Sequence, residues 1–96
     1  MPGFKITSKA LDDLRSIGQY TSSRWGVAQR NRYLAMLDNS FQAISNEPLL
    51  GKPCDDIKPG YRKYYAGRHL IFYRTTQSNV QIVRILHDSM DIERHF

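Results

Sequence analysis

The spacing of apolar residues changes along this chain, and each change marks a new element. Alternation over Phe4–Thr7 predicts a short opening strand. Ser8 is then a suitable helix N-cap, with Asp12 and Asp13 early in the helix, where acidic groups stabilise the helix dipole. The apolar stripe of this helix continues weakly to Trp25 and consists of Ala10, Leu11, Leu14 and Ile17.

Gly26 interrupts the first helical pattern, so a second helix is expected to begin near Val27. It should end by Asn46, because Pro48 cannot continue a helix and constrains the residue before it. Two helices joined by a tight glycine turn predict a helical hairpin. The apolar stripe of the second helix is Tyr33, Leu34, Leu37, Phe41 and Ile44.

Three strands are predicted after a Gly- and Pro-rich loop at Leu49–Gly60. They cover Tyr61–Ala66, His69–Thr75 and Val80–Leu86, and the short connections between them imply an antiparallel meander. The order β-α-α-β-β-β predicts an α+β fold, with the helical hairpin packed on one face of a small antiparallel sheet. We expect residues 1–96 to form one domain.

The last strand is apolar on both faces and carries an arginine. Strict alternation places Val83 and Ile85 on one face and Ile82, Arg84 and Leu86 on the other. An arginine inside an apolar strand indicates a charge that reaches a sheet edge, a cleft or a partner. Because two helices cover only one face, the tail or a second protein should cover part of the other.

The C-terminal tail, Ser89–Phe96, is too irregular to predict a long helix, because Met90 and Ile92 do not share a helical face. Two interpretations stay open. A short turn folds Met90 back onto the sheet, or the tail joins the sheet in a partner-binding surface.

The net charge of +5 is distributed unevenly along the 96 residues. The first 50 residues carry six basic and four acidic side chains, whereas Ile57–His87 carries six basic and no acidic ones. This pattern predicts an anionic partner, either nucleic acid or an acidic protein segment, and the alternative is a solvated sheet face. The six residues are Lys58, Arg62, Lys63, Arg68, Arg74 and Arg84.

The composition argues against a membrane protein, a secreted protein and a metal-binding protein. With 41% hydrophobic residues and no apolar run near the roughly 20 residues of a membrane helix, neither a membrane span nor a signal peptide is predicted, and a cytoplasmic location is expected. The single cysteine, Cys54, reads as an incidental loop thiol. His69, His87 and His95 lack the clustered spacing of a zinc site, so no metal or other cofactor is expected.

A metal-free phosphoryl-transfer site was the main catalytic alternative. His87 has the chemistry of an acid or base, Arg62 and Arg84 could hold a phosphate beside Lys63, and Tyr64 or Tyr65 could orient a substrate. No spacing among them is diagnostic, and a histidine at a strand end is more often a hydrogen-bonded structural residue. No catalytic residue is therefore assigned.

The chain resembles toxins of the RelE/ParE superfamily of type II toxin–antitoxin pairs, most closely the ParE branch. The resemblance covers nearly the full length, its order of elements agrees with the one predicted above, and its most specific part is the closing strand. It is carried by Ala10-Leu11-Asp12-Asp13-Leu14, Arg24-Trp25-Gly26, Tyr61-Arg62-Lys63, Leu70-Ile71-Phe72-Tyr73-Arg74, Arg84-Ile85-Leu86-His87 and Met90-Asp91.

The resemblance implies one of two activities. RelE-like members are ribosome-dependent mRNA endonucleases that use lysines, arginines and a late tyrosine or histidine, whereas ParE-like members poison DNA gyrase. Here the loop supplies only Lys52 and Lys58, and no tyrosine follows Tyr73, which favours the gyrase poison. A non-toxic interaction module or decayed toxin is a third alternative.

The resemblance also implies a ParD-like antitoxin whose C-terminal segment wraps the toxin, with DNA contacted only indirectly through the complex. Such segments are commonly acidic and fold on binding, which agrees with the basic half of the chain. No contact with a membrane is expected. The residues expected to bind antitoxin or gyrase are Arg62, Lys63, Arg68, Arg84, His87 and Asp91.

Overall fold

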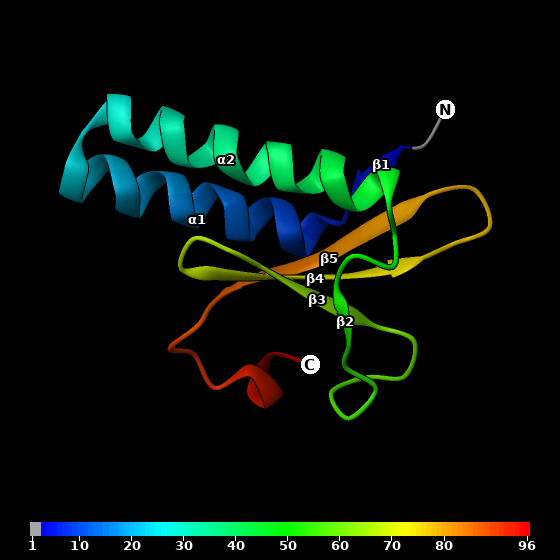
Figure 1. Cartoon of the computed structure of the whole chain (residues 1–96). Coiled ribbons are helices and arrows are strands. Elements are labelled where there is room, and N and C mark those ends of the chain that lie inside the picture. Colours follow the sequence, from blue (N-terminus) through cyan, green and yellow to red (C-terminus); the bar gives the residue numbers. More distant parts are fainter. Residues whose placement is uncertain (1–2) are drawn as a thin grey trace.

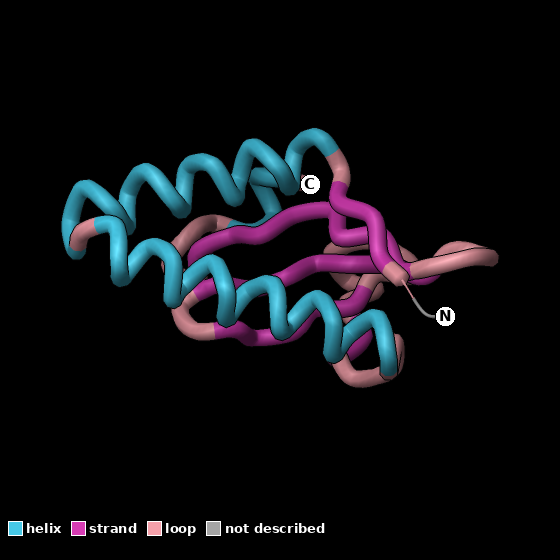
Figure 2. The backbone as a smooth tube through the Cα atoms, turned by 90° about the horizontal axis from the view of Figure 1, so that it is seen from above, coloured by secondary structure: helices cyan, strands magenta, loops and turns pink. Residues whose placement is uncertain are grey.

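The computed structural model describes residues 3–96 and shows a helix pair, a sheet and a C-terminal tail stacked in that order (Figure 1). Seen from above, the two helices run side by side across the sheet (Figure 2). This arrangement confirms the predicted α+β fold. In chain order, the elements are β1 (Phe4–Ile6), α1 (Ser8–Trp25), α2 (Val27–Asn46), β2 (Lys52–Pro53), β3 (Arg62–Ala66), β4 (His69–Thr75), β5 (Val80–His87) and the 3-10 helix η1 (Ile92–His95).

The sheet is mixed, so the prediction of a purely antiparallel sheet was wrong. Its strand order is β1-β5-β4-β3-β2, and β1 runs parallel to β5. The meander β3-β4-β5 is antiparallel, as its short turns require. The helical hairpin follows β1, and this long connection lets the first strand lie in either direction. The short strand β2 extends the other edge, with Lys52 opposite Lys63.

Both helices end where the sequence predicts, but the start of α1 differs by one residue. Thr7 is the N-cap, and its Oγ1 accepts from the Ala10 N–H at 3.2 Å and donates to the Val83 carbonyl at 3.1 Å. The break falls at Gly26, whose φ of 90° favours glycine. Within the described residues 3–96, neither helix combines the length and apolar character required to cross a bilayer.

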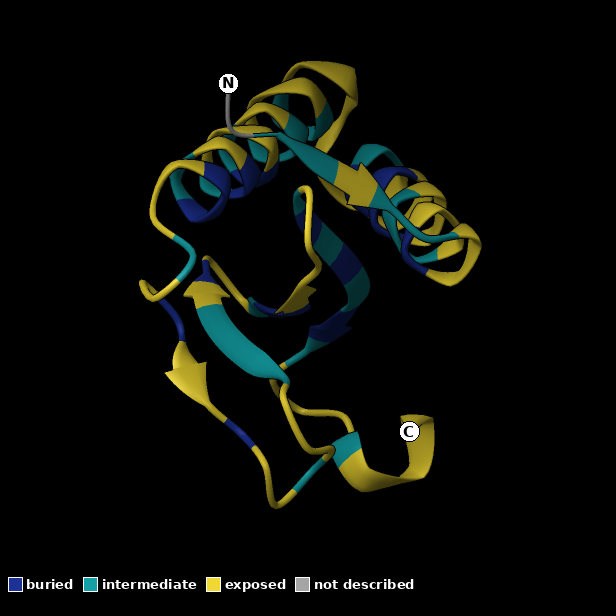
Figure 3. Ribbon diagram, turned by 90° about the vertical axis from the view of Figure 1, so that its right-hand side faces the viewer, coloured by how far each residue is buried: buried dark blue, intermediate teal, exposed yellow. Residues whose placement is uncertain are grey.

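Two apolar clusters lie on opposite faces of the sheet. The first joins both helices to one face, around Leu37, Ile71 and Tyr73. The second is formed by the other face and the tail, where the Phe96 ring lies 5.0 Å from the Phe72 ring. In Figure 3, buried positions lie where the helices and the sheet face each other. The tail therefore covers part of the second face, which is one of the two possibilities predicted from the sequence (the tail or a second protein).

The tail covers the sheet with Ile92 and Phe96 and not with Met90, the residue predicted to fold back. Ile92 packs against the second cluster, and the Phe96 ring also lies 5.9 Å from the Tyr61 ring. Met90 is exposed instead of folded onto the sheet. The reason is a tight turn, in which the Met90 N–H donates to the His87 carbonyl at 3.0 Å and directs the chain away from β5 before η1 begins.

A β-bulge in β5 corrects the predicted alternation. Tyr73 of β4 pairs with Ile82, but its neighbour Phe72 pairs with Arg84, so Val83 is an extra residue. Ile82 and Ile85 consequently both face the helices, whereas Val83 lies on the face covered by the tail. The assignment of Ile82 and Ile85 to opposite faces was therefore wrong.

Candidate functional site

A cleft of about 550 Å³ opens between the tip of the helical hairpin and the ends of β4 and β5. The helices contribute aromatic and apolar side chains together with Ser16, Thr21 and Gln29, and we call this side the wall; the opposite side, the floor, is polar. Trp25 lies at the hairpin tip, which extends beyond the sheet (Figure 1), and is 65% exposed instead of packed on the predicted stripe. The wall contains Ile17, Tyr20, Trp25, Tyr33 and Met90, and the floor contains Arg68, His69, His87 and Ser89.

The Tyr33 hydroxyl joins the His69 ring to the neighbouring backbone at the floor. Its oxygen accepts from the Arg68 N–H at 3.0 Å and forms a second hydrogen bond, 2.6 Å long, with His69 Nδ1. Burial, with a smaller contribution from the neighbouring His87, lowers the pKa of His69 to about 4. The ring is therefore neutral at pH 7.

His87 lies beside His69, and the two rings meet edge to face with centroids 5.2 Å apart. The Ser89 N–H donates to His87 Nδ1 at 3.1 Å, and the Ser89 hydroxyl lies 2.7 Å from the same nitrogen. A neutral His87 must therefore carry its proton on Nε2. The Asp88 carboxylate lies 3.2 Å from Nδ1, and it becomes an ion-pair partner only when the ring is protonated.

Because the folded protein keeps His69 neutral, we expect the protein to become less stable as the pH is lowered through one defined window. The unfolded chain binds a proton at His69 near pH 6.5, but the folded chain does so only near pH 4. Between these values the unfolded state binds more protons, so the free energy of unfolding decreases as pH falls from about 6.5 towards 4. Urea unfolding across this range should show the decrease, and His69→Asn should remove most of it. An unchanged slope in the variant would contradict the assignment.

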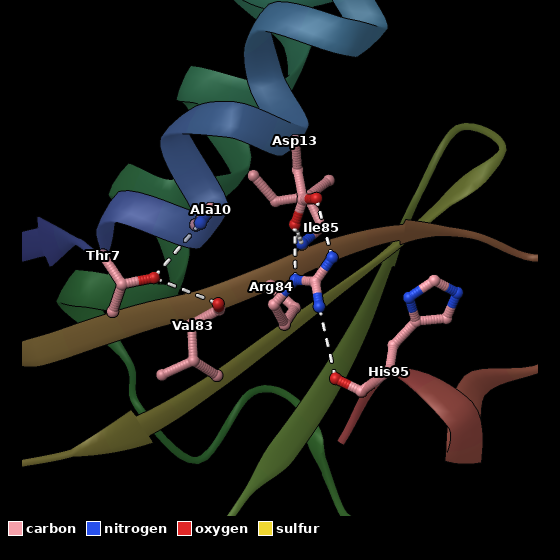
Figure 4. Close-up of polar contacts among 7 residues, drawn as sticks. All are labelled: Thr7, Ala10, Asp13, Val83, Arg84, Ile85 and His95. Carbon is pink, nitrogen blue, oxygen red and sulfur yellow. Dashed lines mark hydrogen bonds and ion pairs between the residues drawn. The ribbon is translucent and has the colours of Figure 1, made fainter.

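The guanidinium of Arg84 is held by Asp13 and by the backbone of the tail (Figure 4). Its Nε and Nη2 donate to the two carboxylate oxygens of Asp13 at 2.8 and 2.9 Å, and Nη1 donates to the His95 carbonyl at 3.2 Å. The same Asp13 carboxylate accepts the Ile85 N–H at 2.9 Å. Asp13 was predicted to stabilise the start of α1, but it lies beyond the first turn and caps the edge of β5 instead. The hydrogen bond to Asp13 raises the pKa of Arg84, which keeps the guanidinium charged.

The cationic residues considered for phosphoryl transfer do not converge. Arg62 pairs with Tyr73 on β4, whereas His87 pairs with His69, and four residues along a strand span about 13 Å. Arg62 donates to the Gly51 carbonyl at 2.7 Å. The structure therefore does not bring Arg62 and His87 together around one phosphate, as the phosphoryl-transfer alternative requires.

The remaining predicted binding residues occupy three places on the surface. Arg68 and His87 lie together at the floor of the cleft. Lys63 lies on β3 beside β2, near the opposite end of the sheet, and Asp91 is exposed in the turn before η1. Cys54 is buried under the tail side of the sheet, and burial raises the pKa of its thiol.

The site residues that sequence reasoning missed are mainly Tyr20, Tyr33 and His69. Tyr33 was placed on the apolar stripe, although its hydroxyl forms the central hydrogen bond of the cleft floor. The sequence did contain an indication of this site, because Tyr20 and Trp25 lie close to Arg24 at the end of the first helix. The Arg24 guanidinium lies 5.8 Å from the centroid of each ring, which is a cation–π geometry.

Sequence comparison places the chain in a known family. A family model described as the ParE toxin of the type II toxin–antitoxin system parDE matches residues 4–92. Toxin ParE1 of Mycobacterium tuberculosis is 39% identical over 93 residues, which cover 96% of this chain and 95% of the relative. Toxin ParE1 of Caulobacter vibrioides is 35% identical over 95 residues, which cover 99% and 98%.

Solved structures share the fold. A chain of the chromosomal ParDE toxin–antitoxin system from P. aeruginosa superposes with a TM-score of 0.79 at 20% identity, covering 91% of this chain and 96% of that one. A chain of the RelBE2 toxin–antitoxin complex from Mycobacterium tuberculosis gives a TM-score of 0.65 at 24% identity, covering 91% and 99%. From the full-length sequence match and this agreement in fold, the chain belongs to the ParE toxin family of type II toxin–antitoxin systems.

Proposed function

We propose that this toxin acts in the cytoplasm by binding DNA gyrase and poisoning it, and that it has no enzymatic activity of its own. Family membership supports toxicity, and the geometry of the cationic residues supports the mode of action. A ribosome-dependent nuclease needs several cations and an acid–base group around one phosphate. Here Arg84 is paired with Asp13, Arg62 lies at the other end of the sheet from His87, and Arg68 is the single Arg or Lys that lines the cleft beside His87 among the described residues. This separation of the cations is the observation that carries the proposal.

We further propose a ParD-like antitoxin as the neutralising partner. Both structural relatives come from toxin–antitoxin systems, which supports a partner of this kind. Residues 57–87 carry no acidic side chain, so an acidic antitoxin segment would meet a favourable potential along β3, β4 and β5. Arg84 contributes indirectly, by fixing the tail. The direct contacts to antitoxin or gyrase would come from Arg62, Lys63, Arg68, His87 and Asp91.

Two assays on the purified protein separate the alternatives. We expect it to inhibit supercoiling by gyrase and to cause cleaved DNA to accumulate, while leaving mRNA on programmed ribosomes intact. Relaxation of the same plasmid by topoisomerase I serves as the control and should be unaffected. Cleavage of ribosome-bound mRNA with unaltered supercoiling would replace the proposal with the nuclease alternative. Inactivity in both assays would favour a non-toxic interaction module.

A further inference from the structure

We propose that the cleft at the hairpin tip is the docking site for an acidic, amphipathic segment of the antitoxin. A carboxylate of this segment would bind at the floor, and an adjacent apolar side chain would pack on the aromatic wall. The identity of the occupant rests on the proposed antitoxin. The chemistry of the site comes from the cleft itself.

The floor presents a hydrogen-bond donor to the cleft. His87 Nδ1 accepts from the Ser89 N–H, so the neutral His87 ring carries its proton on Nε2. Among the described residues, every buried side-chain nitrogen and oxygen has a hydrogen-bond partner. His87 Nε2 makes no hydrogen bond with any of these residues, so it must be accessible, and His87 lines the cleft. An acceptor from a partner would satisfy this donor.

The charges around the floor favour a carboxylate over other acceptors. Arg68 is the charged residue of the lining, and no acidic residue of the described chain lines the cleft. Two carboxylates lie nearby. Asp13 is neutralised by Arg84, and Asp88 lies against His87 Nδ1, the nitrogen that does not carry the proton in the neutral ring. A carboxylate that enters the cleft therefore meets Arg68 and the His87 Nε2–H donor.

The wall is suited to an apolar side chain beside that carboxylate. Tyr20, Trp25 and Met90 are all exposed large hydrophobic residues at this cleft. Exposed aromatic residues that rim a concave surface are typical of sites that bury a partner's side chain. Arg24, stacked beside the two aromatic rings, adds positive charge at the rim. The combination selects a segment that has apolar and acidic residues side by side.

Nuclear magnetic resonance on the full chain, with acetyl-Phe-Glu-amide as the probe peptide, tests the proposal. We expect saturable shifts of the His69, His87, Trp25 and Met90 signals. The uncharged analogue acetyl-Phe-Gln-amide should bind about 2- to 5-fold more weakly, because it lacks the charge. The bound carboxylate should also move the titration of His69 to higher pH. The other groups that act on this ring are Asp13 on α1, Tyr33 on α2, Arg68 on the turn, His87 on β5 and Asp88.

Two variants provide matched controls. Arg68→Gln should weaken binding of the glutamate peptide about 2- to 5-fold and leave the glutamine peptide unaffected. Arg74→Gln removes an exposed arginine from the other end of β4 and should change neither affinity. The proposal would be overturned if both peptides bound equally well, if the chemical-shift changes were centred on Lys63, or if millimolar peptide caused no chemical-shift changes. Cleft shifts that depend on protein concentration without peptide would assign the cleft to self-association. None of these outcomes depends on gyrase inhibition, so the two proposals can fail separately.

Discussion

Replacing Arg84 with alanine should lower the free energy of unfolding by about 2–3 kcal/mol, because the change leaves the Asp13 carboxylate without its ion-pair partner. The two side chains are only 15% and 14% exposed, so water replaces the lost contacts poorly. Arg84 also holds the tail through the His95 carbonyl. In a chain of this size the melting temperature should fall by roughly 10 °C or more. Thermal and urea unfolding measure both quantities.

The ion pair between Arg15 and Asp12 on the same helix is the matched control. These side chains are 71% and 73% exposed, so Arg15→Ala should change stability by less than about 0.5 kcal/mol. Asp13→Ala should be at least as harmful as Arg84→Ala, since it also removes the acceptor of the Ile85 N–H. A stable Arg84→Ala protein with weakened partner binding would instead show that Arg84 is a direct contact.

The helices and the meander were predictable because their signals are local. Apolar spacing, Gly26 and Pro48 act within a few residues of the boundaries that they determine. β1 and β5 pair in parallel although both helices and three other strands lie between them in the sequence. No local sequence pattern determines the relative direction of two strands that are so far apart. The bulge at Val83 is equally hidden, because an apolar residue is acceptable on either face of β5.

The candidate site was less predictable because it is assembled from distant parts of the chain. Arg84 appeared free in the sequence, since its partner Asp13 lies 71 positions away. The cleft likewise combines Tyr33 on α2 with His69 and His87 on neighbouring strands. A tyrosine on an apolar helical stripe gives no indication that its hydroxyl will form a hydrogen bond with a histidine of the sheet. Charge counting located the basic half of the chain but did not locate the cleft.

Tyr73→Phe should cost about 2–4 kcal/mol, although it removes one oxygen atom only. The fully buried Tyr73 hydroxyl accepts from the Gly51 N–H at 2.7 Å and donates to the Pro48 carbonyl at 2.8 Å. Phenylalanine leaves both backbone groups unpaired, and each unpaired buried group costs roughly 1–3 kcal/mol. Urea unfolding measures the loss. Hydrogen exchange at the Gly51 amide should accelerate more than exchange in α1.

The effect of Tyr73→Phe should extend to a predicted binding residue. The Gly51 carbonyl accepts from Arg62, so a loosened loop frees that guanidinium, and its signals should become more mobile. Tyr65→Phe is the matched control, because Tyr65 is exposed on the neighbouring strand β3. It should leave stability and Gly51 exchange unchanged. If Tyr73→Phe were equally neutral, water would have to replace the hydroxyl, and the hold on Arg62 would come from β2 pairing with β3 instead.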